Sequence, residues 1–251
     1  MSNIPKKLKA DAIAEALLEV RFQCKEATQL PELVVGKLAD NPVWKDYEKA
    51  RLPVSEIPAS LRAQDENLRF QPLLEVRDAQ KVSVAKIGSN VLSYHRLAPY
   101  PGGDTFVREV NQCIDFLFKS LTEVTASRLG LRYINLFTEA EHGIKSVNDL
   151  DQKITLAGAI LSAPLNLNYR AKWKEEFESI VKIASPEFVA GAPSKPFVAL
   201  VDVDVFTPKQ FTTSSAEAVK NWVEEARQFQ KEEFFKLFTA DMRKRLVEEQ
   251  K

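Results

Sequence analysis

The 251-residue sequence predicts an α+β fold built from two halves with the same order of elements. Each half reads as a strand, a helix, three or four strands and a long helix. Strand-like segments follow one another across short turns rather than crossover helices, which predicts a largely antiparallel sheet. We therefore expect a single domain, residues 1–251, made of two pseudo-repeats, about 1–124 and 125–251. Their strands would form one curved sheet, covered on one face by the long helices.

The first half opens on a segment with the alternation of a strand. In Ala12–Phe22, AIAEALLEVRF, every second residue from Ala14 onward is apolar and the opposite face is mixed. Pro31 suits the first turn of a helix over Glu32–Asp40. Further strands are expected at Leu52–Ile57, Leu68–Val76, Lys81–Ile87 and Val91–Leu97, the last two forming a hairpin around Gly88.

A long amphipathic helix closes each half. Apolar residues at helical spacing predict the first over Thr105–Leu121, with Asp104 as its N-cap. The second follows a capping box at Ser214-x-x-Glu217, and Thr239 is expected to cap a last helix over Asp241–Glu249. Between these helices we expect a short helix at Val147–Ile154 and strands at Arg128–Phe137, Ala159–Ala163, Leu165–Tyr169, Phe177–Ala184 and Phe197–Phe206.

Four segments resemble a sporadically distributed family of bacterial proteins of about this length. They are AIAEALLEVRF, APYPGGDTF, LGLRYINLF and EEFFKLFTADMRKRL, which together span most of the chain in outline, and LRYIN is the most specific of them. The family has no established activity to transfer. The resemblance therefore implies the architecture and a bacterial origin only.

Composition argues against several classes of function. Lys plus Arg and Asp plus Glu are 35 each, and a net charge of zero is unlike that of a dedicated nucleic-acid or membrane-surface binder. The sequence contains neither of the two common phosphate-binding motifs, G-x-G-x-x-G and G-x-x-x-x-G-K-[ST]. It also has no apolar run long enough to span a bilayer and no signal-peptide pattern. Cys24 and Cys113 are expected to be free thiols in a reducing cytoplasm. We expect no cofactor.

Two sets of charged residues are candidate ligands or partners. Asp202 and Asp204 alternate with valines, so both carboxylates lie on one face, where a hard cation such as Mg²⁺ could bind, although a solvated strand face explains them as well. Glu15 and Arg132 lie on the mixed faces of the two equivalent strands. If the halves join there, we expect direct contact between them, as a structural pair or as a ligand-recognition site.

The histidines are weak catalytic candidates. His95 lies in a hairpin strand, and a catalytic triad would require a serine or cysteine within hydrogen-bonding reach. No G-x-S-x-G elbow is present, which favours a structural role. His142 lies in a polar loop.

Aromatic residues of the last long helix suggest an interaction surface. Phe235 and Phe238 fall outside the stripe formed by residues such as Val219 and Leu237, so one buried face cannot accommodate them all. Either the last helix folds back over Phe235, or the ring contacts a partner or a second copy of the chain.

These observations favour a non-enzymatic module that binds a protein or peptide. An enzyme or small-molecule binder, with a pocket between sheet and helices enclosing two or more ionisable groups, is the main alternative. A saddle-like nucleic-acid binder is a third hypothesis, which would require a basic concave face.

Overall fold

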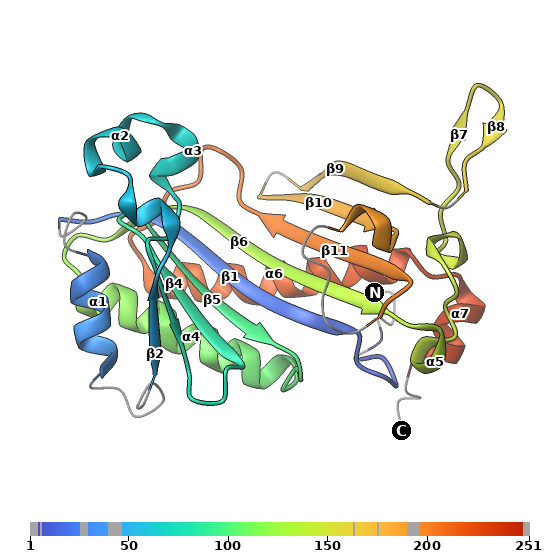
Figure 1. Cartoon of the computed structure of the whole chain (residues 1–251), viewed down its shortest axis with the longest axis horizontal. Coiled ribbons are helices and arrows are strands. Elements are labelled where there is room, and N and C mark those ends of the chain that lie inside the picture. The colour runs from blue at the N-terminus through green and yellow to red at the C-terminus, as the bar shows by residue number, and fades with distance from the viewer. Residues whose placement is uncertain are drawn as a thin grey trace. The chain divides into compact units, whose positions relative to one another are not determined.

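The computed structural model describes residues 5, 7–25, 30–39, 47–162, 164–174, 176–189 and 196–247. It has an α+β fold with a large antiparallel sheet of nine strands, in the order β2-β3-β4-β5-β1-β6-β11-β10-β9 (Figure 1). A separate two-stranded ribbon pairs β7 with β8. The strands are β1 (Ile13–Gln23), β2 (Glu48–Arg51), β3 (Leu74–Arg77), β4 (Ser83–Ile87), β5 (Val91–Leu97), β6 (Thr125–Phe137), β7 (Thr155–Leu156), β8 (Ala159–Ile160), β9 (Asn166–Lys174), β10 (Phe177–Ala184) and β11 (Ala199–Phe206).

The chain divides into two compact units, each built from separate segments. The β1–β5 unit comprises residues 15–131 and 206–225, and the β9–β11 unit comprises residues 1–14, 132–205 and 226–251. The helices are α1 (Leu30–Ala39), α2 (Ala59–Gln64), α3 (Glu66–Arg69), α4 (Gly103–Ser120), α5 (Glu139–His142), α6 (Ala216–Lys236) and α7 (Ala240–Leu246).

In the β1–β5 unit the structure confirms the first strand and the hairpin. Every second residue of β1 from Ala16 to Phe22 is buried, as the alternation predicts. The hairpin pairs β4 with β5, and the Gly88 N–H donates to the Val91 carbonyl at 2.9 Å. A Cβ on Gly88 would lie 2.5 Å from the backbone oxygen of Gln71, so the turn requires glycine.

Helix α4 packs on the hairpin of the same unit. Its buried stripe includes Phe106, whose ring lies 6.3 Å from the ring of Tyr94 on β5. The expected N-cap was wrong: Gly102 occupies that position with φ of 93°, and Asp104 lies in the first turn. A carboxylate there still interacts favourably with the positive end of the helix dipole.

Two strand predictions in this unit were wrong because proline and local capping favour helical turns. Leu52–Ile57 contains a 3₁₀ turn at Pro53–Glu56, with proline at its first position. Leu68–Val76 is divided between the end of α3 and β3. Asp65 caps α3 by accepting a hydrogen bond from the Asn67 N–H at 2.7 Å. Helix α1 is present near its expected place, although Asp40 lies outside the described residues.

In the β9–β11 unit the long strands agree with the sequence pattern. Strand β10 has the expected bounds, and β11 and β9 begin within two residues of their expected starts. Strand β9 runs on to Lys174, five residues beyond its expected end at Tyr169. In the expected strand at Ala159–Ala163 only the two residues of β8 are strand among the described positions, and Ala163 lies outside them. The expected helix at Val147–Ile154 is a single 3₁₀ turn, Val147–Asp149, held by a capping box from Ser146.

Helix α6 begins one residue later than the sequence motif suggests. The Ser215 hydroxyl accepts the Ala218 N–H at 3.2 Å, whereas the Ser214 hydroxyl bonds to Thr125. The predicted apolar stripe is buried at every position: Val219, Trp222, Val223, Ala226, Phe234 and Leu237. Thr239 caps α7 as expected, through the Met242 N–H at 3.2 Å.

Candidate functional site

Three residues of the β1–β5 unit form a hydrogen-bonded array that the sequence motifs did not reveal. The Ser93 Oγ lies 2.8 Å from His95 Nε2, and His95 Nδ1 lies 2.5 Å from Glu15 Oε1. Ser93 and His95 are 6% and 7% exposed. The serine that a triad would require is therefore present beside His95, on the same strand. Its only signal in the sequence is the i, i+2 spacing of Ser93 and His95, which places both on one strand face.

The same sheet face carries ion pairs of alternating sign. Glu19 accepts hydrogen bonds from Arg21 and from Arg128, both at 2.8 Å. Glu75 on β3 bonds to Arg77 at 2.6 Å and lies 3.8 Å from Lys86 on β4. These four cations share two carboxylates, Glu19 and Glu75, so the positive charge of this face is only partly neutralised.

Arg132 forms a bidentate pair with Asp202 in the β9–β11 unit. Its Nε and Nη2 donate to the two carboxylate oxygens at 2.8 and 2.5 Å, and the Asp202 side chain is 8% exposed. Arg132 neutralises the carboxylate, which argues against the cation site proposed for Asp202 and Asp204. Among the described residues, no group of three or more His, Cys, Asp and Glu could hold a metal ion.

The predicted contact between Glu15 and Arg132 stays a prediction. Glu15 belongs to the β1–β5 unit and Arg132 to the β9–β11 unit. Within its own unit, Glu15 bonds to His95 and Arg132 bonds to Asp202. Each predicted site residue therefore engages a partner that the sequence pattern did not identify.

Phe235 and Phe238 are core residues. They are 5% and 0% exposed, and their ring centroids lie 6.3 Å apart. Phe234 contacts both rings, at 5.2 and 5.1 Å, and Phe137 of β6 lies 5.7 Å from Phe238. Of the two alternatives, the structure shows burial rather than an exposed partner surface, because the aromatic cluster (Phe137, Phe234, Phe235 and Phe238) encloses both rings within the chain.

Burial holds His142 and Cys113 in their neutral forms. Burial lowers the pKa of His142, whose ring packs edge-on against Phe137 at 5.1 Å. Burial, and to a lesser extent the charge of Glu109, raises the pKa of the Cys113 thiol to about 12. Neither Cys113 nor Cys24 forms a disulfide. A protonated thiol is a poor nucleophile, so Cys113 is unsuited to catalysis.

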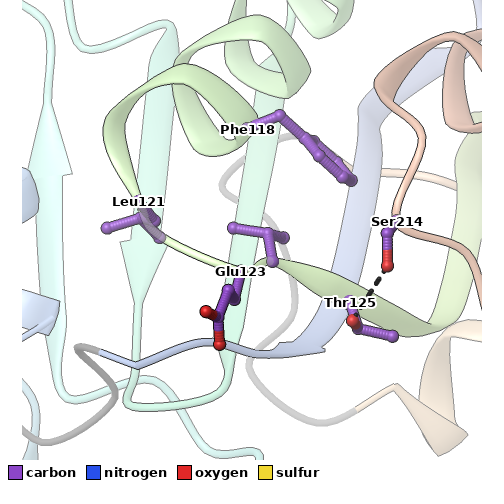
Figure 2. A pocket seen from close by; sticks show the side chains of 6 residues that line it. Phe118, Leu121, Glu123, Thr125 and Ser214 are labelled. Atoms are coloured by element: carbon purple, nitrogen blue, oxygen red, sulfur yellow. Dashed lines mark hydrogen bonds between the residues drawn. The ribbon is translucent and has the colours of Figure 1, made fainter.

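A pocket of about 460 Å³ lies at the end of α4 (Figure 2). Its wall includes Phe118 and Leu121, the Thr125–Ser214 hydroxyl pair and a single ionisable side chain, Glu123. Glu123 is paired with the exposed Lys25. A site with one solvated, paired carboxylate lacks the two or more ionisable groups that the small-molecule alternative requires.

An apolar hairpin, residues 154–162, extends from the β9–β11 unit as strands β7 and β8 (Figure 1). Leu156 and Ile160 are each 66% exposed, and Leu161 is 40% exposed. No charged residue occurs from position 154 to position 165. Large exposed aliphatic side chains gathered on one element are typical of an interaction surface.

Comparison with known proteins adds no further constraint. Neither a scan against family models nor a search of the curated proteins finds a match. No helix in the described ranges is long and apolar enough to cross a membrane. The candidate sites must therefore be judged on their geometry and chemistry.

Proposed function

We propose that the chain is a protein-binding module and that its apolar hairpin associates with a second copy of the chain. The observation that carries this proposal is the exposure of Leu156 and Ile160, 66% each, on an element without charge. A two-stranded hairpin is at best marginally stable alone in water. Burying these side chains against another protein would remove apolar surface from water and stabilise the hairpin.

A second copy offers a suitable surface. Strand β9 is the last strand in the order of the sheet, so one of its edges has no neighbour among the strands that the structure describes. Tyr169, Ile180 and Phe188 of the same unit are 38%, 37% and 46% exposed. Open edges and exposed apolar residues are common sites of strand addition. The net charge of zero also means that two copies do not repel each other over long distances.

This arrangement predicts a symmetric dimer. The hairpin and the accepting edge belong to one unit, so a two-fold axis would place each hairpin on the partner's edge and form both contacts at once. The contact would be largely apolar. We therefore expect association to weaken little as salt rises, in contrast to a charge-driven interface.

Sedimentation velocity of the full-length chain and of a Leu156→Asp/Ile160→Asp variant tests the proposal. Full burial of Leu or Ile contributes about 1.5–3 kcal/mol, so two side chains that are two-thirds exposed would contribute about 2–4 kcal/mol. The variant should dissociate at least roughly 30-fold more readily. Leu61→Asp, a leucine 55% exposed in the other unit, is the matched control and should leave association unchanged.

The duplicated architecture is also a proposal. The strand order supports the duplication. In the first half, β5, β4 and β3 follow β1 outward from the centre of the strand order. In the second half, β11, β10 and β9 follow β6 outward in the same way. Strands β5 and β11 each precede a long helix, α4 or α6. We propose that these helices cover one face of the sheet. Strand-for-strand superposition of residues 1–124 on residues 125–251 would test the duplication.

The other expectations remain proposals with less support. A partner could still bind the solvated faces of α6 and α7, although not through Phe235 or Phe238 as they are placed here. The bacterial family, the cytoplasmic location and the single domain remain predictions from the sequence. Sequencing the neighbouring genes would test the bacterial origin and show whether a partner is encoded nearby.

A further inference from the structure

The Ser93–His95–Glu15 array has the connectivity of a nucleophile, a general base and an orienting acid. His95 uses both ring nitrogens: Nδ1 toward Glu15 at 2.5 Å and Nε2 toward Ser93 at 2.8 Å. An ionised carboxylate can only accept hydrogen bonds, so it favours the tautomer with the proton on Nδ1. That tautomer leaves the Nε2 lone pair to accept the Ser93 hydroxyl proton.

The antiparallel register of β1 and β5 creates this geometry. Ser93 and His95 are two residues apart on β5 and therefore share a face, while the register pairs Glu19 with Ser93 and Leu17 with His95. Glu15 is two residues before Leu17 on β1 and is therefore the diagonal neighbour of His95 on the same face. A glutamate side chain is long enough to reach a diagonal neighbour. All three residues lie on regular strands, so their spacing is fixed by backbone pairing rather than by a loop.

Two features of the surroundings favour acyl transfer: the burial of the array and a nearby lysine. Ser93 and His95 are almost fully buried, which strengthens electrostatic interactions between them, while the Glu15 side chain is 27% exposed. Lys86 of β4 is the register partner of Ser93 on the other side. Cross-strand partners lie about 4.5–5.5 Å apart at Cβ, so the ammonium group can approach an oxyanion formed on Ser93.

We propose that Ser93 is a nucleophile that His95 and Glu15 activate toward esters with small acyl groups. The Ser93 Oγ forms a bond to the acyl carbon while its proton moves to His95 Nε2. The bond from that carbon to the alcohol oxygen then breaks, and the leaving alkoxide takes the proton. Water next attacks the acyl-serine, transferring a proton through His95 to the Ser93 Oγ as the acid leaves. Because Ser93 is only 6% exposed, the acyl group it accepts is limited to a size such as acetyl.

A fluorophosphonate probe tests the nucleophile directly, because it bonds to an activated serine with loss of fluoride. Intact mass and peptide mapping of the full-length chain should show one adduct, on Ser93, and none in Ser93→Ala. Glu15→Gln should slow labelling by on the order of 10²–10⁴-fold, since the amide no longer favours the required tautomer. Hydrolysis of p-nitrophenyl acetate should fall in parallel.

Ser83→Ala is the matched control. Ser83 is a buried strand serine, 4% exposed, that bonds to Tyr94 and Arg96 rather than to a histidine. Its variant should label on Ser93 at the wild-type rate, and circular dichroism should show that each variant is folded. Absence of a Ser93 adduct in the folded wild-type protein would overturn the proposal. Wild-type labelling by Glu15→Gln would overturn the role of the acid. The hairpin interface is independent of either outcome.

Discussion

Replacing Phe235 with alanine distinguishes a core ring from a docking surface. The ring is 5% exposed and lies 5.2 Å from Phe234 and 6.3 Å from Phe238. Truncating a buried phenylalanine to alanine costs about 3–5 kcal/mol, because transfer energy is lost and a cavity remains. Native domains are stable by only about 5–15 kcal/mol, so this is a large share of the total. An exposed docking ring would cost about 0.5 kcal/mol or less.

Urea unfolding followed by far-UV circular dichroism measures the difference. We expect the Phe235→Ala midpoint to fall markedly with little change in slope, since the slope reports the surface exposed on unfolding. Leu61→Ala, at a leucine 55% exposed in the β1–β5 unit, should shift the midpoint very little. A loss below about 1 kcal/mol for Phe235→Ala would show that the ring is not packed as described. A charged replacement such as Phe235→Asp would unfold the aromatic cluster and is unsuitable for testing an interface.

Two further predictions concern the β1–β5 unit. Gly88→Ala should lower the free energy of unfolding by about 1–3 kcal/mol, because the new Cβ would lie 2.5 Å from the Gln71 backbone oxygen. Gly36→Ala lies in helix α1, where no atom is within 4 Å of the new Cβ, and should instead raise the free energy of unfolding by about 0.5–1 kcal/mol. Chemical denaturation measures the free energy of unfolding of both variants. Equal effects of the two substitutions would contradict the described turn. Because the pKa of Cys113 is raised to about 12 from 9.0, the unfolded chain releases that proton first, so stability should fall as pH rises from about 9 to about 12. Cys113→Ala should reduce this alkaline loss in thermal melts, and an unchanged slope would show that the thiol is not desolvated.

The sequence predicts the fold best where the pattern of apolar residues depends on a single strand or helix. Alternation identified β1, and the apolar stripe identified α6, because each depends on which side chains face the core. The errors occur where two local signals compete. At Leu52–Ile57 we expected a strand, whereas Pro53 favours a helical turn. At the start of α6, two adjacent serines are both suitable caps, and only the structure shows that Ser215 is used.

The candidate site could not be predicted because it depends on register. Glu15 and His95 are 80 residues apart in the sequence, and only the pairing of β1 with β5 brings them together. Arg132 and Asp202, 70 residues apart, also meet through the fold rather than through a motif. The aromatic residues misled for a related reason. A single helix cannot bury Phe235 and Leu237 on one stripe, but a cluster of rings from several elements can surround both sides.

Hydrogen exchange of the full-length chain at low and high protein concentration tests the proposed function most directly. Self-association through the apolar hairpin predicts that amides of residues 154–162 and of strand β9 exchange more slowly at high concentration, while those of the β2 edge do not change. Identical exchange of the hairpin at both concentrations, in a sample that sedimentation shows to be dimeric, would contradict the account.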